Sequence, residues 1–528
     1  MKKLNDLEYL KLSKFQAFVY NLKMFFCAIP GWFKNLFLTI FASIKNAAIA
    51  VKDEFVDIFH TFTKGNWAVK LSFLVFGLGN IYYGQIMRGV LFLLFELIFV
   101  FYMFIPFGTN QIGMGLHHLG NCHWFKTGAT VGTVQGQMVY DEFYDTDIWQ
   151  KGDDSVRVLL YGILTVIFII AFIGTWRMQV KQCRICMDIT AKGKKVKSGK
   201  EDLQSLLDDQ FHKTLLTPSL IGILAFTVLP IIFMIIIAFT SYDAVNDGFS
   251  NLFTWVGLDN FNALTDFGQG GVGIAFSELL GWTLMWAFFA TFTNYFLGMM
   301  VAIMINKKGI VIKKFWRTVL VMTIAIPQFV SLLYISKMLS GTGFLGSIIE
   351  DIPFIKDYLT ANKFTGLWNS PLIAKILLIV INIWIGIPYV MLMATGILMN
   401  IPADLYESAK IDGANGYQQF TKITLPYMLF VTGPYLLTSF VGNLNNFNVI
   451  YLLTGGAPAN QALGTVAGTE VGQTDLLVTW LFKLTIGNTS ARYYMASVIG
   501  IMIFLVVAGL SLIIYNIIPS TKNEEDYS

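Results

Sequence analysis

Charged residues are scarce in this 528-residue sequence. Asp, Glu, Lys and Arg together make up 13% of it, whereas soluble globular domains have about 25%. Hydrophobic residues make up 55%, so too few polar side chains are present to cover a water-exposed surface. The composition therefore excludes a soluble globular protein and requires lipid as the solvent for much of the chain.

Cysteine and histidine are also scarce, with four Cys and five His. Cys183 and Cys186 form a C-x-x-C pair in a basic segment, but a structural zinc site needs a second ligand pair. We therefore expect free thiols on the reducing side of a membrane, and we predict no metal site. An alternative metal cluster consists of His117, His118, Cys122 and His123. The favoured interpretation is that these four are polar loop residues without a ligand role.

A phosphate-binding loop of the form G-x-x-x-x-G-K-[ST] is absent. The nearest approach is Gly193, Gly199 and Lys200, which has one spacer residue too many and Glu201 in place of the hydroxyl residue. Such a loop is needed to cradle nucleotide phosphates. We predict that the chain is not an enzyme and binds no cofactor, so that any ATP is handled by another chain.

Long apolar segments are what the sequence has in abundance. Each is long enough to cross a bilayer as a helix that satisfies its own backbone hydrogen bonds. The predicted fold is thus an all-α polytopic membrane protein with about eight transmembrane helices, at 89–107, 158–176, 215–239, 274–305, 315–338, 376–399, 427–447 and 494–518. Residues 69–85 contain three glycines and predict a re-entrant or interfacial hairpin rather than a ninth span.

Lysine and arginine are unevenly distributed between the loops. Residues 177–213 carry nine Lys and Arg, whereas residues 240–273 carry four Asp and no Lys or Arg. The positive-inside rule then places both termini in the cytoplasm, as an even number of spans also requires. Residues 108–157 and 454–493 are expected to be external caps or docking surfaces.

The predicted organisation has four parts. Residues 1–68 alternate apolar faces with lysines, which is typical of helices in the cytoplasmic interface. Residues 69–209 hold the hairpin, the first two spans, an external loop and a basic cytoplasmic linker. Residues 210–518 form a six-helix core that includes a cytoplasmic loop at 401–426, and residues 519–528 form a cytoplasmic tail.

The segment "ADLYESAKIDGANGYQQFTKITLPYM" at 403–428 predicts a compact helix–turn–helix on the cytoplasmic face. A first helix runs over Tyr406–Asp412 with Glu407 near its start, where the helix dipole favours an anion. Gly413 permits the reversal, and a second helix begins at about Tyr417 and ends at Pro426. This shape is suited to docking into a cleft on a partner.

The loop resembles one that binding-protein-dependent importers carry. The motif of that loop is E-A-A, followed by three residues, G, nine residues and I-x-L-P. The sequence has Ser where the motif has its first Ala and agrees elsewhere, the seven positions being Glu407, Ser408, Ala409, Gly413, Ile423, Leu425 and Pro426. The resemblance covers residues 210–518 and is strongest to the larger membrane subunit of maltose-type importers. It rests also on "VGLDNFNAL" at 256–264, "NIWIGIPYVM" at 382–391, "SFVGNLNNFNVIYLLTGGAP" at 439–458 and "TDLL" at 474–477.

The resemblance implies a MetI-like permease core in an ATP-binding-cassette importer. Its cargo would be a sugar, maltose/maltodextrin or a related oligosaccharide, crossing the cytoplasmic membrane of a prokaryote. The implied partners are a second permease subunit, two ATPase subunits that hold ATP-Mg, an extracytoplasmic sugar-binding protein and membrane lipid, with no nucleic acid. The seven loop residues would couple the chain to an ATPase.

An ion-coupled secondary transporter is the alternative function. Such a protein usually carries charged residues within its spans. The obvious candidates here are Glu96, Glu278 and Lys375.

Polar and aromatic side chains within spans six and seven are suited to sugar hydroxyls and sugar CH faces. Ser439 and Asn443 are four residues apart and share a helical face, and Gly386 with Pro388 would interrupt span six. The candidate sugar contacts that follow from residue type alone are Asn382, Trp384, Tyr389, Ser439, Asn443, Asn445 and Asn446. Each Asn or Ser has an alternative role in an interhelical hydrogen bond.

The resemblance narrows the set of sugar contacts. It implies Asn382, Ile385, Gly386, Tyr389, Ser439 and Asn443, and on span five it implies Ile324 and Gln328. The family has Tyr and Ser at these last two positions.

Overall fold

The computed structural model describes residues 49–517 except 108–111, 125, 151, 197, 200, 202–203, 205–207, 209–210, 248–250, 269, 308, 310–311 and 487–490, together with residues 38, 41–43 and 45–46. Most of the interfacial region expected at 1–68 and the tail at 519–528 lie outside the described residues. The chain divides into two compact units. The first unit contains residues 1–116 and 164–221, and the second contains residues 117–163 and 222–528.

Seven helices are long and apolar enough to cross a membrane, in the part of the chain that the structure describes. Their bounds are α5 (Ile86–Phe104), α7 (Ser155–Ala191), Thr214–Ile237, α12 (Val272–Asn306), α17 (Pro371–Leu398), Gly416–Leu444 and α23 (Tyr493–Ile517). The third of these combines the end of α9 (Phe211–Ile223) with the π-helical turn η1 (Leu224–Val228) and α10 (Leu229–Ile237). The all-α polytopic fold is therefore confirmed.

Span five, expected at 315–338, is not one straight helix. It consists of α13 (Lys313–Ala325) and α14 (Gln328–Met338), which meet at an angle of 93°. The cause is Pro327, because a proline disfavours helical backbone in the residue before it, and Ile326 is extended with ψ 128°. The count of eight holds only if this bent pair is one span.

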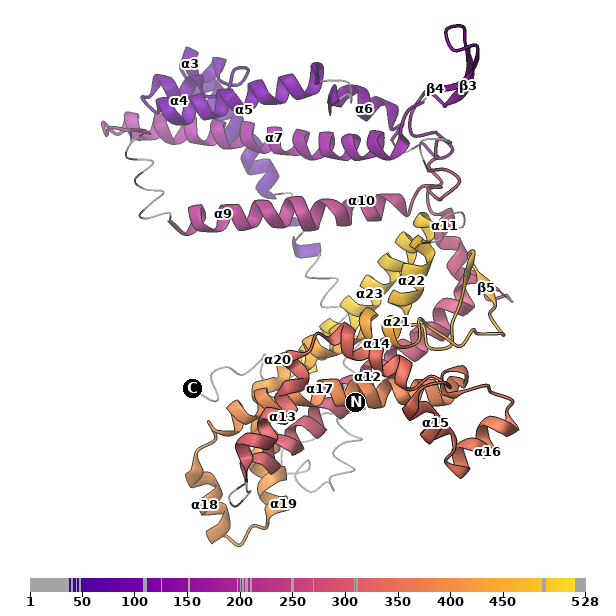
Figure 1. The fold of residues 1–528 in the computed structure, drawn as a ribbon. Coiled ribbons are helices and arrows are strands. Elements are labelled where there is room, and N and C mark those ends of the chain that lie inside the picture. Colours follow the sequence, from indigo (N-terminus) through magenta and orange to yellow (C-terminus); the bar gives the residue numbers. More distant parts are fainter. Residues whose placement is uncertain are drawn as a thin grey trace. The chain divides into compact units, whose positions relative to one another are not determined.

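Aromatic side chains pack α5 against α7 in the first unit, where the two helices lie side by side (Figure 1). Phe99 stacks on Phe172 with 4.0 Å between ring centroids, and Phe95 and Phe99 both contact Phe168. The cysteine pair of the C-x-x-C motif, at 183 and 186, lies on α7 as buried free thiols. Aromatic stacking thus holds these spans together, beside a 3.1 Å hydrogen bond between the Tyr102 and Thr165 hydroxyls.

Residues 69–85 contribute two short helices, α3 (Trp67–Leu71) and α4 (Leu78–Tyr82), joined by an irregular stretch at 72–77. Side chains from the spans satisfy the backbone of this stretch. Trp176 donates its Nε1–H to the Phe73 carbonyl over 3.1 Å, and Glu96 Oε2 accepts the Phe76 amide over 2.8 Å. Neither short helix has the length needed to cross a bilayer.

In the second unit, α12, α17 and α20 (Leu425–Leu444) form the centre of a bundle (Figure 1). The first two helices approach closely at Gly298, where an added Cβ would lie 2.5 Å from Val390 Cβ. Buried side chains fill the space between the helices, among them Trp286, Leu332, Leu378, Tyr295, Met391 and Met428.

The predicted interruption of span six is wrong. Helix α17 is continuous from Pro371 to Leu398, with Pro388 buried inside it. A proline removes one backbone hydrogen bond and usually kinks or breaks a helix. Here the helix is retained because its buried face packs along α12 over most of its length.

The predicted helix end at Pro426 is also wrong. The chain is helical from Gly416 to Leu444 through α19 (Gly416–Gln419), the π-helical turn η4 (Phe420–Thr424) and α20. A π-helical turn widens the backbone just before the proline, where the ring would otherwise meet the carbonyl four residues earlier. At its other end α20 stops at Leu444. Asn445 and Asn446 therefore lie beyond the span, and Asn446 caps α21 (Phe447–Leu453).

The segments between spans form short helices and hairpins. Strands pair as β1 (Pro106–Phe107) with β2 (Ile112–Gly113), β3 (Gln137–Asp141) with β4 (Thr146–Gln150), and β5 (Thr465–Val466) with β6 (Thr469–Glu470). The short helices are α6 (Gly115–Asn121), α11 (Asp259–Asn262), η2 (Ala263–Thr265), α15 (Phe344–Glu350), α16 (Pro353–Ala361), η3 (Leu367–Asn369) and α22 (Leu477–Ile486).

The alternative metal cluster at 117–123 finds no support in this geometry. Within the described ranges, no group of three or more His, Cys, Asp and Glu is placed to hold a metal ion. Burial raises the pKa of the Cys122 thiol to about 12, whereas metals bind the thiolate.

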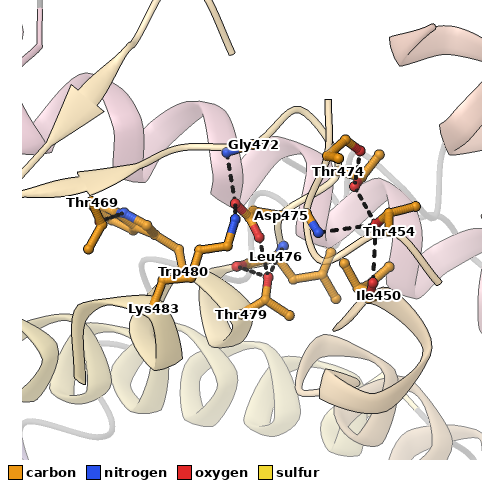
Figure 2. A network of polar contacts seen from close by, with 12 residues as sticks. Ile450, Thr454, Thr469, Gly472, Thr474, Asp475, Leu476, Thr479, Trp480 and Lys483 are labelled. Atoms are coloured by element: carbon orange, nitrogen blue, oxygen red, sulfur yellow. Dashed lines mark hydrogen bonds and ion pairs between the residues drawn. The ribbon is translucent and has the colours of Figure 1, made fainter. Parts of the chain in front are cut away.

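A buried carboxylate organises the segment at 454–486 (Figure 2). Asp475 is fully buried, and its Oδ2 accepts hydrogen bonds from Lys483 Nζ at 2.6 Å and from the Gly472 amide at 2.7 Å. Its Oδ1 accepts the Thr479 hydroxyl at 2.9 Å. Burial raises the pKa of the Asp475 carboxyl, and the Lys483 ammonium acts in the opposite direction. The carboxylate thereby ties the β5–β6 end of the segment to α22.

Candidate functional site

A cavity of about 380 Å³ in the second unit is lined by seven of the eight residues that the resemblance implies as sugar contacts, all except Ile324. It lies among α12, α14, α17 and α20. Residues far apart in the sequence are thus brought to one place. Four further residues complete the lining: Thr291, Asn294, Val390 and Tyr435.

Helical spacing explains why these residues share the cavity. Asn382, Ile385, Gly386 and Tyr389 stand at i, i+3, i+4 and i+7 on α17, which places them on one face. Tyr435, Ser439 and Asn443 repeat every four residues on α20 with the same result. Gln328 is the first residue of α14, so the bend at Pro327 determines the position of its Cα and hence of its side chain.

Two polar atoms in this cavity are buried without a hydrogen-bond partner in the described part of the chain. They are Asn294 Oδ1 and Asn382 Nδ2. Buried polar groups are normally paired, because an unpaired one costs free energy. The cavity therefore offers one acceptor and one donor that a bound hydroxyl group can satisfy together.

Gly386 allows α12 to contribute to the site. An added Cβ there would lie 2.3 Å from Asn294 Nδ2, so a larger residue would displace the Asn294 side chain. This close approach is the physical reason for a glycine in the middle of an otherwise apolar, well-packed helix.

Sequence reasoning missed Thr291, Asn294 and Tyr435. The available signal was a polar residue within the apolar run at 274–305, or a tyrosine four residues before Ser439. Asn443 Nδ2 donates to Thr291 Oγ1 at 3.0 Å. The interhelical hydrogen bond expected as the alternative role of Asn443 is therefore present alongside its place in the cavity.

Other expected positions lie elsewhere. Trp384 is 47% exposed on α17, and neither it nor Ile324 lines the cavity. Lys375 places its ammonium 4.7 Å from the Trp282 ring centre, and Glu278 accepts a 2.8 Å hydrogen bond from Asn460. None of the lining residues is charged. The site is thus suited to a neutral, hydroxyl-rich ligand of the size range that protein pockets usually hold.

The cytoplasmic helix–turn–helix expected at 403–428 begins with α18 (Ala403–Ile411). Gly413 has φ +78°. The Ala414 amide donates to the Ala409 carbonyl and the Gly413 amide donates to the Lys410 carbonyl, at 2.8 and 3.0 Å. This is the Schellman arrangement, in which the left-handed residue is usually glycine. On the other side of the turn, Asn415 and Gln418 cap α19 reciprocally.

The predicted place of Glu407 near a helix start is wrong. Helix α18 begins at Ala403, so its acidic first-turn residue is Asp404. The sequence has good helix formers on both sides of Tyr406, and the helix therefore extends one turn further back than expected. Glu407 is an exposed residue in mid-helix.

The helix–turn–helix is fixed at its base and apolar at its tip. The Tyr406 hydroxyl lies 2.8 Å from Thr424 Oγ1, and Leu425 packs against a buried cluster. At the tip, Ile411 is 87% exposed and Tyr417 is 75% exposed. Apolar side chains exposed together mark a contact surface. The remaining motif residues are placed as follows: Ser408 and Pro426 exposed, Ala409 and Ile423 half-buried.

Comparison with known proteins gives consistent similarities. Residues 294–523 match the family described as "Binding-protein-dependent transport system inner membrane component". The chain is 31% identical over 474 residues to the maltodextrin transport system permease protein MdxF of Bacillus subtilis, covering 88% of this chain and 99% of that protein.

Two further similarities concern other carbohydrates. The chain is 31% identical over 432 residues to the galactooligosaccharides transport system permease protein GanP of Bacillus subtilis, covering 78% of this chain and 96% of that protein. A crystal structure of a bacterial ABC transporter involved in the import of the acidic polysaccharide alginate aligns with TM-score 0.46 and 22% identity, covering 60% of this chain and 97% of that one.

Proposed function

Because this chain belongs to the binding-protein-dependent transport system inner membrane components, we propose that its cavity is the sugar site of an ATP-binding-cassette importer. The chain is a multi-pass permease component of the cytoplasmic membrane. The observation that carries the proposal is that residues from α14, α17 and α20, chosen as sugar contacts, line one uncharged cavity.

The cargo we propose is a neutral oligosaccharide. Two relatives of equal identity, 31% each, are named for maltodextrin and for galactooligosaccharides, so identity does not rank the two sugars. The lining supplies amides, hydroxyls and the aromatic rings of Tyr389 and Tyr435. Hydroxyl groups bind to the former and the CH faces of a sugar ring pack on the latter.

The proposed partners are a second permease subunit, two ATPase subunits that hold ATP-Mg, and an extracytoplasmic sugar-binding protein. The family depends on a binding protein, which supports the last of these. The exposed apolar tip at Ile411 and Tyr417 supports docking of α18 and α19 into an ATPase groove. Since Tyr406 and Leu425 attach this element to the bundle, movement of the ATPase would be transmitted to α20 and to the cavity that α20 lines.

The ion-coupled alternative is less well supported. None of the three charged candidates lines the cavity. Glu96 accepts the Phe76 amide, Glu278 accepts a hydrogen bond from Asn460, and Lys375 lies over the Trp282 ring. Coupling of an ion to a substrate requires a charged or coordinating group that senses the occupied site. The described cavity lining provides no such charged group.

Asn443→Ala is the substitution that tests the proposed sugar site. It should reduce uptake at limiting sugar about two- to thirteen-fold, the range that follows from losing one hydrogen bond of about 0.5–1.5 kcal/mol. Assembly and basal ATP hydrolysis should be retained. Uptake of labelled malto- and galacto-oligosaccharides by cells with the whole transporter measures the effect.

Asn445→Ala is the matched control, because Asn445 lies just beyond α20 and is exposed. It should transport normally. Equal uptake by both variants across limiting sugar concentrations would show that Asn443 does not contact the sugar and serves only in its interhelical hydrogen bond with Thr291.

Single cysteines in a cysteine-free chain test the proposed orientation. Lys195→Cys and Lys308→Cys should be shielded from an impermeant thiol reagent in intact cells, whereas Asp247→Cys should label, because positively charged loops stay in the cytoplasm. Labelling is read on the purified chain. The reverse pattern would place both termini outside and remove the helix–turn–helix from the ATPase side.

A further inference from the structure

A second cavity, of about 370 Å³, lies wholly within the first unit. It combines aromatic rings with a single carboxylate, and its lining residues are Phe73, Leu74, Phe76, Glu96, Phe172, Ile173 and Trp176. None of them belongs to the proposed sugar site or to the helix–turn–helix. The transport function proposed above leaves this cavity without a role.

Glu96 is an unusual residue for its position. It lies in the apolar span α5, and Oε2 accepts the Phe76 amide at 2.8 Å. Among the described residues this is its one hydrogen bond, and no Lys, Arg or His forms an ion pair with it. A carboxylate at membrane depth is costly unless a cation or a proton accompanies it.

The rings around Glu96 are held in fixed pairs. Phe76 stacks on Phe172 with 4.8 Å between centroids, and Phe73 meets Trp176 edge to face at 5.8 Å. Trp176 Nε1 also donates to the Phe73 carbonyl, which fixes the indole. Aromatic faces carry partial negative charge and attract organic cations, and ammonium groups bind in cages of such rings.

We propose that this cavity binds an organic ammonium group, with Glu96 as its counter-ion and the rings of Phe73, Phe76 and Trp176 against its alkyl substituents. Such a ligand supplies the missing positive charge without the hydration that a metal ion would have to lose. The two sources of this chemistry are the ethanolamine headgroup of a phospholipid and a soluble amine. The proposal does not depend on which sugar is transported, or on whether the other cavity binds one.

Calorimetric titration of the purified transporter with choline tests the proposal. The matched ligand is 3,3-dimethylbutan-1-ol, which has the shape of choline without its charge. We expect choline to bind about tenfold more tightly than the alcohol or better, because cation–π attraction and the carboxylate act only on the charged ligand. Equal affinities would show an apolar pocket only and would overturn the proposal.

Glu96→Gln tests the counter-ion. The glutamine carbonyl can still accept the Phe76 amide, so the fold is retained and size-exclusion chromatography should show an intact complex. Choline affinity should fall several-fold toward that of the alcohol, because the counter-ion is lost while the cation–π attraction remains. Glu201→Gln is the matched control, because Glu201 Oε2 also accepts a backbone amide, that of Ser198 at 2.8 Å, but lies outside the cavity. Loss of choline binding in the control, or its retention in Glu96→Gln, contradicts the proposal.

Native mass spectrometry after delipidation identifies the source. Phosphatidylethanolamine and phosphatidylglycerol are added back separately to the parent chain and to Glu96→Gln. Retention of phosphatidylethanolamine by the parent chain alone assigns the site to a lipid headgroup. Choline binding without such retention assigns it to a soluble amine. Absence of both overturns the proposal.

Discussion

Gly413→Ala is expected to weaken retention of the ATPase subunits on purification and to reduce sugar-stimulated ATP hydrolysis and uptake, with normal membrane insertion. Gly413 has φ +78°, and an added Cβ there would meet nothing within 4 Å. The cost is therefore backbone strain alone, about 1–2 kcal/mol for a residue with a Cβ in this conformation. The turn should relieve that strain by opening, which displaces the exposed tip. The β-branched variant Gly413→Val should be worse and abolish stimulated hydrolysis.

Gly416→Ala is the control for this effect. Gly416 is three residues away in the same loop and also has open space around its Cα, but it is the first residue of α19 and has no positive φ. Its variant should couple normally. Glu407→Lys tests the docking surface without touching the turn, and it should also weaken ATPase retention. Normal transport with bound ATPase in both Gly413→Val and Glu407→Lys would disprove the coupling role.

Asp475→Ala is expected to destabilise the segment at 454–486. The substitution leaves the Lys483 ammonium, which is 22% exposed, without its partner, and it removes acceptors for Gly472 and Thr479. Breaking one side of a buried ion pair costs about 3–5 kcal/mol. In limited proteolysis of the reconstituted protein, the protease should then cut within 454–486, and thermal unfolding should begin at a lower temperature.

The exposed pair of Lys356 and Asp351 provides the comparison. Their side chains are 64% and 75% exposed at an N–O distance of 3.3 Å. Exposed ion pairs contribute about 0–1 kcal/mol, so Asp351→Ala should leave proteolysis and unfolding unchanged. Equal sensitivity of the two variants would show that burial does not set the importance of Asp475.

The transmembrane architecture could be predicted because it depends on local patterns. Apolar runs of sufficient length gave the spans, and a spacing of four residues placed Ser439 and Asn443 on one face of α20. Gly413 could be read as a reversal because a left-handed residue is a local requirement. These features depend on each segment alone.

The features that were missed depend on two segments together. Thr291 and Asn294 are polar residues in an apolar run, and only the packing of α12 against α17 makes them part of the cavity. Pro327 and Pro388 look equivalent in the sequence, yet the first separates two helices at 93° and the second lies inside one. The difference lies in the buried packing of α17, which a single segment does not reveal.

The π-helical turn at Phe420–Thr424 gives the chain one position at which its length can change without rotating α20. Such a turn holds one residue more than the α-helical turn it replaces, yet both complete about one rotation. Deleting one residue there, with restoration of a regular α-helix, would therefore leave Tyr435, Ser439 and Asn443 facing the cavity. The same deletion within α20, between Leu425 and Tyr435, would rotate all three by about 100°.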